Sequence, residues 1–222
     1  MAALATIETE SGPDPVATLV ILHGLGADGN DFVPIARELD LSVIGPVRFV
    51  FPEAPVIPVT INNGHRMRAW YDIRGTESQG LEDEAGLRQT LAAVDALLLR
   101  EQERGIAAGR IVLAGFSQGC AIALLAGLRH GNRLAGVAGL SGYLPLAAST
   151  AAEAAEANKA TPVFLAHGSQ DQMVVPQRGR ASRDALAALG YQVEWHEYPM
   201  GHTVSMEEIQ DLNAWLLRVL TR

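Results

Sequence analysis

Short apolar runs rich in β-branched and aromatic residues recur along the chain, and longer segments with helical spacing lie between them. Such runs are typical of strands, and a run that is apolar at almost every position is typical of a central parallel strand covered on both faces. The run that begins at Arg110 is of this kind. The predicted strands are Thr18–Leu22, Val47–Phe51, Arg110–Ala114, Leu134–Leu140, Pro162–Ala166 and Tyr191–Tyr198.

The clearest predicted helix lies between the second and third of these runs. Its apolar positions recur at i, i+4, i+7 and i+11 and share one face: Leu87, Leu91, Val94 and Leu98. Acidic residues crowd its first turn, and Gly105 follows its last turn, as expected at the two ends of a helix. Two further helices are predicted, one that ends with Asp184–Leu189 before Gly190 and a final amphipathic one at Glu207–Leu220.

Repeated alternation of strand and helix predicts an α/β fold, in which right-handed crossovers join a mostly parallel central sheet with helices on both faces. Neither a linker nor an internal repeat interrupts the pattern. We therefore expect a single domain over residues 1–222.

Two segments lack a clear period. Ile57–Gly80 is long enough for a functional loop, because long loops in compact domains often carry function. Ala147–Ala160 is rich in alanine, and we interpret it as a short surface helix with Thr150 and Glu153 as its capping box. A lid over a site is the alternative for this second segment.

Composition excludes several classes of protein. The chain is 48% hydrophobic and 19% charged, which is typical of a folded protein with a full core. Its formal net charge of −8 argues against a nucleic-acid partner, because phosphate attraction needs a basic face. The single cysteine, Cys120, cannot form an intramolecular disulfide, and Met1–Glu10 does not resemble a secretory signal, so we expect a cytoplasmic protein.

One uncharged stretch, Ile111–Leu128, has the length of a minimal membrane span. Gly115, Ser117, Gln118 and Gly119 interrupt it, so we interpret it as a buried strand, a turn and a buried helix. No stable membrane insertion is expected.

The turn in this stretch, Gly115–Gly119, has the pattern G-x-S-x-G between an apolar strand and an apolar helix. A tight strand-to-helix turn forces its central residue into a strained conformation and raises that side chain above the sheet, and it needs small neighbours. Ser117 is therefore the candidate nucleophile. A glycine-rich turn with an incidental serine is the structural alternative.

A serine hydroxyl needs a base to take its proton, and in this fold class the acid and the base follow the serine in the order Ser…Asp/Glu…His. Asp171 lies just after a predicted strand, on the edge of the sheet where sites form. His202 lies in a loop between the last strand and the last helix, from which it can reach the serine. Asp184 and Asp211 fall in predicted helices and are expected to be surface charges.

The other histidines have competing interpretations. We expect His196 on a strand surface, and His167 packed beneath Asp171. His65 and His130 have no supporting context and are predicted to be surface residues.

An oxyanion hole needs N–H donors fixed where negative charge develops. The amide after the nucleophile, that of Gln118, is one candidate. The second is expected on the loop after an early strand, where we assign the Leu25 N–H.

The same early loop offers a different class of function. Gly24–Gly29 matches G-x-G-x-x-G, the dinucleotide-binding pattern, and Glu53 lies near the distance expected for a ribose-binding acid. Asp28 and Asp31 would place negative charge where a pyrophosphate must lie, so a dinucleotide-binding protein is the less favoured hypothesis.

Across nearly its whole length the chain resembles the carboxylesterase, lysophospholipase and acyl-protein thioesterase family of α/β hydrolases. The segments that carry the resemblance are His23–Phe32, Phe51–Ile73, Gly115–Gly119, His167–Asp171 and Gly201–His202. The resemblance implies a serine carboxylesterase for short to medium acyl chains, with an acyl-protein thioesterase or a lysophospholipase as the alternative. It also implies nucleophile Ser117, acid Asp171, base His202 and oxyanion amides of Leu25 and Gln118, as the residues themselves indicate.

The resemblance further implies a small-molecule ester substrate and no cofactor, and some relatives form homodimers. No Cys/His cluster has the spacing of a metal site, so we expect no metal. Trp70 lies in a stretch that resembles a family signature near the site, where it either contacts substrate or packs as a buried structural residue. The loop Asp171–Pro176 is one residue longer than the resemblance leads us to expect, which affects the shape of the acyl pocket.

Overall fold

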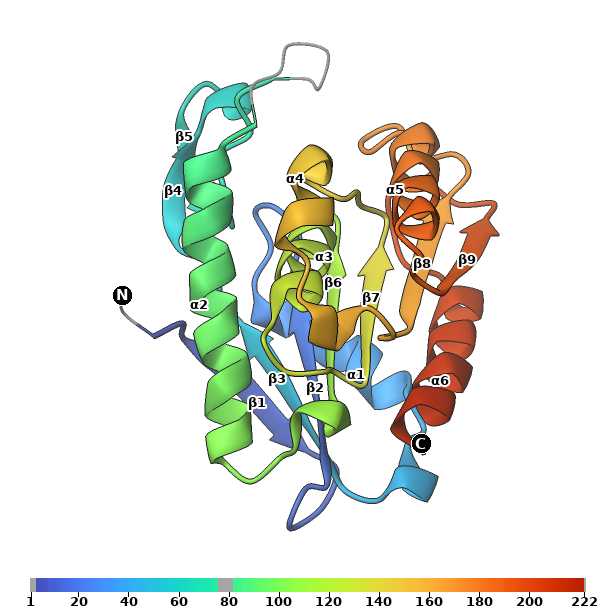
Figure 1. The fold of residues 1–222 in the computed structure, drawn as a ribbon. Helices are drawn as coiled ribbons and strands as arrows, with labels where there is room; N and C mark the ends of the chain where they lie inside the picture. The colour runs from blue at the N-terminus through green and yellow to red at the C-terminus, as the bar shows by residue number, and fades with distance from the viewer. Residues whose placement is uncertain (1–2, 76–81, 222) are drawn as a thin grey trace.

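A computed structural model describes residues 3–75 and 82–221 of the chain. Strands from most of its length form one seven-stranded sheet in the order β1-β3-β2-β6-β7-β8-β9 (Figure 1). All neighbours are parallel except β1 and β3, which are antiparallel. The strands are β1 (Thr6–Glu10), β2 (Ala17–Leu22), β3 (Val47–Pro52), β6 (Ile111–Phe116), β7 (Gly136–Leu140), β8 (Val163–Gly168) and β9 (Val193–Tyr198).

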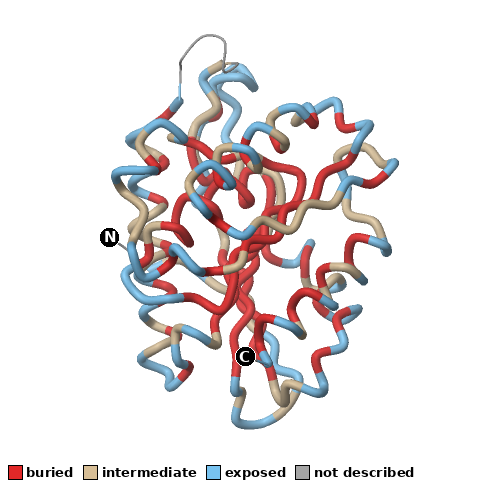
Figure 2. Tube along the Cα trace, turned by 45° about the vertical axis from the view of Figure 1, so that its right-hand side comes forward, coloured by how far each residue is buried: buried red, intermediate tan, exposed pale blue. Residues whose placement is uncertain are grey.

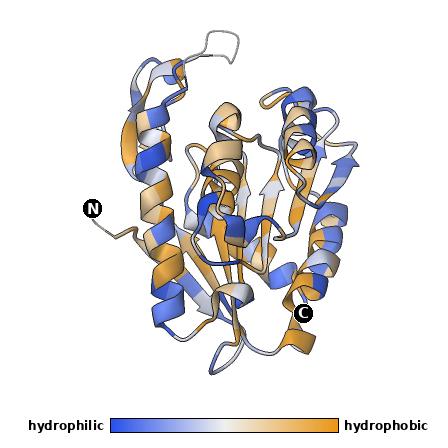
Figure 3. Cartoon of the chain, viewed as in Figure 1, coloured by the Kyte–Doolittle hydropathy of each residue, from blue (hydrophilic) through white to orange (hydrophobic). Residues whose placement is uncertain are grey.

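Helices cover both faces of this sheet, as the sequence predicts. On one face, α2, α3 and α5 pack into one apolar core, and α1 and α6 pack into a second core on the other face. Figure 2 shows the buried residues running through the middle of the molecule, and Figure 3 shows apolar residues in the central strands and on parts of the helices. The helices are α1 (Val33–Glu38), α2 (Glu84–Glu103), α3 (Gln118–Arg129), α4 (Ala147–Glu153), α5 (Pro176–Ala188) and α6 (Met206–Leu220).

The strand β6 lies in the middle of the sheet, between β2 and β7. Ile111 and Leu113 of β6 enter the core beneath α2 and α3, whereas Val112 and Ala114 enter the core beneath α1 and α6. An apolar residue is needed at every position because both faces are covered. The α/β prediction is confirmed, and the single domain stays a prediction from the sequence.

Two strand regions were not predicted. The edge strand β1 mixes polar and apolar residues, and it pairs only with β3. Part of Ile57–Gly80 forms an antiparallel hairpin of β4 (Val56–Val59) and β5 (His65–Arg68). Residues 76–80 of that predicted loop lie outside the described residues.

The alanine-rich segment Ala147–Ala160 begins with the short helix α4, as expected. The predicted capping box is wrong, because Thr150 lies inside α4, is fully buried and donates its hydroxyl to the Leu146 carbonyl. Glu153 instead accepts from Arg88 and Arg129. The helix is therefore held by tertiary contacts rather than by its own cap.

The uncharged stretch Ile111–Leu128 is a strand, a turn and a helix, as predicted. Within residues 3–75 and 82–221, no helix has the length and apolar character needed to span a bilayer.

Candidate active site

Ser117 occupies the sharp turn between β6 and α3. Its backbone has φ 55° and ψ −116°, a left-handed conformation that non-glycine residues rarely adopt. The glycines on either side permit the turn: a Cβ at Gly115 would collide with the Gly119 carbonyl, and a Cβ at Gly119 would collide with the Leu22 carbonyl. The sequence pattern and the local geometry thus agree, and the strain is located at the candidate nucleophile.

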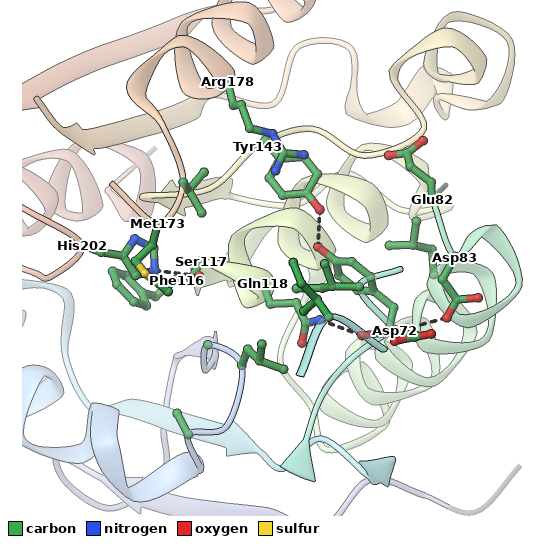
Figure 4. Close-up of a pocket in the computed structure, with 18 of the residues that line it drawn as sticks. Asp72, Glu82, Asp83, Phe116, Ser117, Gln118, Tyr143, Met173, Arg178 and His202 are labelled. Carbon is green, nitrogen blue, oxygen red and sulfur yellow. Dashed lines mark hydrogen bonds between the residues drawn. The ribbon is translucent and has the colours of Figure 1, made fainter. Parts of the chain in front are cut away.

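Two later loops bring an acid and a base to this serine. The Ser117 hydroxyl lies 2.8 Å from Nε2 of His202, to which it can donate (Figure 4). The Nδ1–H of His202 donates to Oδ2 of Asp171 over 2.7 Å. Asp171 lies between β8 and α5, and His202 lies between β9 and α6. An imidazole so oriented can accept a serine proton, which is the arrangement that nucleophilic acyl transfer needs.

The Asp171 carboxylate is fully buried and its acceptors are occupied. Besides the His202 bond, its Oδ1 accepts the backbone N–H groups of Met173 and Val174 at 2.8 and 3.0 Å. His167 packs beside it as expected, and its Nε2–H donates to the Val174 carbonyl over 2.8 Å. Burial lowers the pKa of His167, so this ring is neutral and fixes the loop rather than competing for charge.

The candidate oxyanion amides lie on the same cavity as Ser117. The Gln118 N–H belongs to the first turn of α3, where N–H groups have no acceptor within the helix and the helix dipole favours negative charge. Leu25 lies in the turn after β2, in which Gly26 N–H donates to Arg68 and Ala27 N–H donates to Gly24. Neither of these two bonds uses the Leu25 N–H.

Trp70 lies behind the cavity rather than in its wall. Its side chain is 1% exposed, and it is absent from the residues that line the cavity. Its position therefore favours the structural interpretation over substrate contact. Sequence analysis missed what it does there: its backbone N–H donates to the Gln118 side-chain oxygen, and its indole N–H donates to the His23 carbonyl.

Ser117 and His202 open onto a cavity of about 1260 Å³ at the carboxyl end of the sheet. Its walls are mostly apolar and come from both cores, with Leu87 and Leu144 from one and Phe32 from the other. The cavity therefore passes over the end of β6 from one face of the sheet to the other, with Ser117 between its two halves. This shape can hold an acyl chain and a leaving group on different sides of the serine.

Two tyrosines form one polar part of the cavity wall. The hydroxyls of Tyr71 and Tyr143 are 2.7 Å apart, and the Arg178 guanidinium lies 3.4 Å from the centre of the Tyr143 ring (Figure 4). Burial raises the pKa of Tyr71 well above its usual value, so the Tyr71 hydroxyl is neutral and can donate or accept.

The remaining histidines lie away from Ser117. His130 is buried and bonds Asp95 over 2.6 Å, so its prediction as a surface residue is wrong. His65 is exposed, as predicted. His196 is partly exposed on β9, stacks on Phe164 at 5.0 Å and therefore belongs to the strand surface as expected.

Cys120 is buried behind the site, and burial raises its thiol pKa to about 12. It therefore packs as an apolar residue. Among residues 3–75 and 82–221, no group of three or more acidic, histidine or cysteine side chains is arranged to hold a metal ion.

The glycine-rich loop does not present a free helix N-terminus. Asp28 caps the short 3-10 helix Gly29–Phe32, and its carboxylate accepts the Asn30 N–H over 2.8 Å. Glu53, the candidate ribose ligand, pairs with Arg68 at 2.9 Å. A pyrophosphate would meet a carboxylate where it needs an N–H donor, which disfavours the dinucleotide hypothesis.

Comparison with known proteins identifies the family of the chain. The model of a family described as phospholipase/carboxylesterase matches residues 4–220. An acyl-protein thioesterase 1 of Mycosarcoma maydis is 40% identical, over 96% of this chain and 95% of that protein. One of Yarrowia lipolytica is 38% identical, over 90% of each. The crystal structure of Arabidopsis thaliana SOBER1 has a TM-score of 0.87 and 32% identity, over 92% of this chain and 99% of that one.

The chain therefore belongs to the phospholipase/carboxylesterase family and has the α/β-hydrolase fold. It is a serine hydrolase that acts on carboxylic esters or thioesters.

Proposed function

We propose that this enzyme is an acyl-protein thioesterase that cleaves the thioester between an acyl chain and a protein through Ser117, His202 and Asp171. The observation that carries the hydrolytic chemistry is the hydrogen-bonded series from Asp171 to Ser117, at 2.7 and 2.8 Å, on the wall of a large apolar cavity. The thioester is proposed from the relatives, which bear the name acyl-protein thioesterase.

The reaction proceeds through an acyl-enzyme. His202 accepts the Ser117 proton as the hydroxyl oxygen attacks the acyl carbonyl, and Asp171 stabilises the resulting imidazolium. The N–H groups of Leu25 and Gln118 bind the oxyanion. The C–S bond then breaks, and His202 returns the proton to the departing thiolate. Water, activated by the same His202, hydrolyses the acyl-enzyme and regenerates Ser117.

The size of the cavity supports a long acyl chain. Ligand pockets typically have volumes of roughly 300–1,000 Å³, and this cavity, at about 1260 Å³, exceeds that range. Its apolar residues can cover a chain of many methylenes, each of which contributes about 0.8 kcal/mol when it leaves water.

A carboxylesterase for short to medium acyl chains, which the sequence favours first, is the second candidate. The longer loop after Asp171 supports it, because Met173 and Val175 of that loop lie at the cavity and are 78% and 45% exposed. These side chains can fold over the opening and shorten the space for an acyl chain. The cytoplasmic location, the homodimer and the absence of a nucleic-acid partner stay predictions from the sequence.

Matched substrate series separate the two candidates. Initial rates are measured on p-nitrophenyl esters from acetate to palmitate, on acyl thioesters of the same lengths, and on a peptide carrying an S-palmitoylated cysteine. We expect kcat/KM to be highest for the long thioesters and the peptide. A maximum at short esters, with no turnover of the peptide, would make the enzyme a carboxylesterase.

The nucleophile is tested with Ser117→Ala. We expect turnover to fall by a factor on the order of 10⁶, the loss seen when the nucleophile of another serine hydrolase is removed. Ser169→Ala is the matched control, because Ser169 is an exposed serine of the loop that carries Asp171. Rates near wild type in Ser117→Ala would contradict the assignment.

A further inference from the structure

The two candidate oxyanion amides come from turns that are far apart in the sequence, so something must fix their relative position. Parallel pairing of β2 with β6 sets Leu22 opposite Gly115 and brings the two turns to the same edge of the sheet. Pairing of the two strands ends at these residues and does not determine how each following turn is oriented. Oxyanion donors act only when they lie about 2.7–3.1 Å from the developing charge.

Trp70 is hydrogen-bonded to both turns. Its indole Nε1–H donates over 2.8 Å to the carbonyl of His23, two residues before Leu25. Its backbone N–H donates over 2.8 Å to Oε1 of Gln118. The Gln118 side chain completes the connection, since its Nε2 donates to the Tyr71 carbonyl over 2.7 Å.

Trp70 is itself held firmly. Its carbonyl accepts the hydroxyl of Thr90 in α2, and its ring packs against the His23 ring with centroids 5.0 Å apart. The His23 ring is fixed in turn, because its Nε2 accepts the Ala54 N–H over 3.1 Å. Burial lowers the pKa of His23, which keeps Nε2 unprotonated and able to accept.

The two turns also touch directly. A Cβ at Gly119 would meet the carbonyl oxygens of both Leu22 and His23, so the start of α3 lies against the turn after β2 without space for a side chain. Rotation of either turn would break this contact and at least one Trp70 hydrogen bond. Trp70 does not line the cavity, so it acts on the substrate only through its neighbours.

We infer that Trp70 is a positioning residue that holds the Leu25 and Gln118 amides in the geometry of an oxyanion hole. This inference rests on the proposed function, in which those amides bind the oxyanion. A tetrahedral intermediate presents more charge to these donors than the ground-state substrate does. Loss of the Trp70 hydrogen bonds should therefore lower kcat and leave KM almost unchanged.

The decisive experiment removes one hydrogen bond and keeps the ring. Position 70 is occupied by 3-benzothienylalanine, an analogue of tryptophan with sulfur in place of the indole N–H, and Trp70→Phe is studied alongside. We expect kcat for p-nitrophenyl butyrate to fall roughly 10- to 100-fold, with KM within about twofold of wild type.

Trp215→Phe is the matched control. Trp215 is 2% exposed and packs in the other core against Phe164, remote from both turns. The Trp215→Phe variant shows how the loss of a buried indole affects stability alone. We expect kcat of this variant to stay near that of wild type.

Binding of a trifluoromethyl ketone gives a readout that a merely structural role would not move. Ser117 adds to the ketone carbonyl and forms a tetrahedral oxyanion in the same hole. The affinity of this inhibitor should fall by the same factor as kcat in the Trp70 variants. The affinity of butyrate, which presents no tetrahedral oxyanion, should not change.

The outcomes are distinguishable. An inactive Ser117→Ala together with wild-type kcat in the benzothienyl variant would overturn the positioning role and leave the proposed function intact. If both Trp70 variants fail to fold, Gln118→Met serves instead, because it removes the side-chain bonds to Trp70 and Tyr71 and keeps the Gln118 backbone N–H. Unchanged kcat and inhibitor affinity in Gln118→Met would likewise overturn the inference.

Discussion

Asp171 shows how one buried side chain determines which ring nitrogen of a neighbouring histidine carries the proton. Its Oδ2 accepts the Nδ1–H of His202, which leaves Nε2 of that ring free to accept from Ser117. In Asp171→Asn, the amide can turn its NH₂ toward His202 and stabilise the tautomer with the proton on Nε2. That tautomer cannot take the serine proton.

We therefore expect kcat of Asp171→Asn to fall on the order of 10⁴-fold, the loss known for the same substitution in a serine protease. The fold should persist, because an amide oxygen can still accept from Met173 and Val174. Steady-state kinetics with circular dichroism check this, and Asp184→Asn, at an exposed aspartate on α5, is the control. A decrease of less than tenfold would show that Asp171 is not the residue that orients His202.

Glu208 provides the second prediction at this scale. It is a fully buried carboxyl on the first turn of α6, and burial raises its pKa from 4.5 to about 8. The folded state therefore keeps a proton that the unfolded state releases above pH 4.5. Between these two values, rising pH favours unfolding by about 1.4 kcal/mol per pH unit. Below pH 4.5 the carboxyl is neutral in both states and the effect is absent.

The side chain of Glu208→Gln is neutral at every pH, so the variant does not lose stability in this way as the pH rises. Its Tm relative to wild type should rise steadily from pH 5 to pH 8, as measured by thermal unfolding at each pH. Glu207→Gln, at the exposed neighbouring position, should show no such trend. If the difference in Tm between Glu208→Gln and wild type were the same at all pH values, Glu208 would not be the group that keeps a proton in the folded state.

At the scale of elements, the sequence predicts those strands and turns whose residues follow a recognisable pattern. The apolar strands and the G-x-S-x-G turn are recognisable because both faces of β6 are covered and because Ser117 needs glycine neighbours. The strands β1, β4 and β5 are missed, since β1 lies at the edge of the sheet and β4 and β5 form a two-stranded hairpin, where no regular alternation of apolar and polar residues is required.

The connection between Trp70 and Gln118 is invisible in the sequence for a different reason. It joins a backbone N–H to a side chain 48 positions away, and no spacing rule relates such a pair. His130 is mispredicted similarly, because it follows α3 and contacts Asp95 and Gln102 of α2, far away in the sequence. Contacts that arise only in three dimensions therefore account for most of what sequence analysis lacks.

The position of α3 makes a prediction at the element scale. Gly119 lies where the helix backbone meets the carbonyls of Leu22 and His23, so Gly119→Ala must push α3 away from β2. We expect it to lower the free energy of unfolding by roughly 1–3 kcal/mol, the usual cost of overpacking, and to reduce kcat as well. Urea unfolding and kinetics measure both effects. Gly131→Ala is the control, because Gly131 has open space around it, and its free energy of unfolding should stay within about 0.5 kcal/mol of wild type. An equally small effect of Gly119→Ala would contradict the close approach of α3 to the turn after β2.

At the scale of the whole molecule, the candidate active site and a network of charged residues lie at opposite ends of the central sheet. Glu101 of α2 is fully buried and accepts hydrogen bonds from Arg48, Arg100, Arg104 and Thr18. These residues connect α2 with β2 and β3, and Glu8 of β1 joins them through Arg100 and Arg104. Thr18 lies near the start of β2, whereas Ser117 lies beyond the end of β6. Stability and catalysis are therefore expected to respond separately to substitution.

Glu101→Gln tests this separation. Burial acts to raise the Glu101 pKa, but the three arginines prevail and hold it below its usual value. The network thus stabilises the fold above the unfolded pKa of 4.5, and that stabilisation is lost as pH falls through the lower folded pKa. Removing the carboxylate takes the shared buried acceptor away from the arginines, which keep only Glu8 and Glu10 as acidic partners. We expect this to cost about 1.5–3 kcal/mol at pH 7, the range for hydrogen bonds to charged groups.

Urea unfolding of Glu101→Gln at pH 7 and pH 4 measures this cost, which should be smaller at the lower pH. Glu103→Gln, at an exposed position two residues further along α2, should cost little at either pH. At 25 °C, where both variants remain folded, kcat should equal that of wild type, because no member of the network lines the cavity. A decrease in kcat of Glu101→Gln while it remains folded would mean that this end of the sheet is coupled to Ser117, since a stability effect alone cannot slow an enzyme that is fully folded.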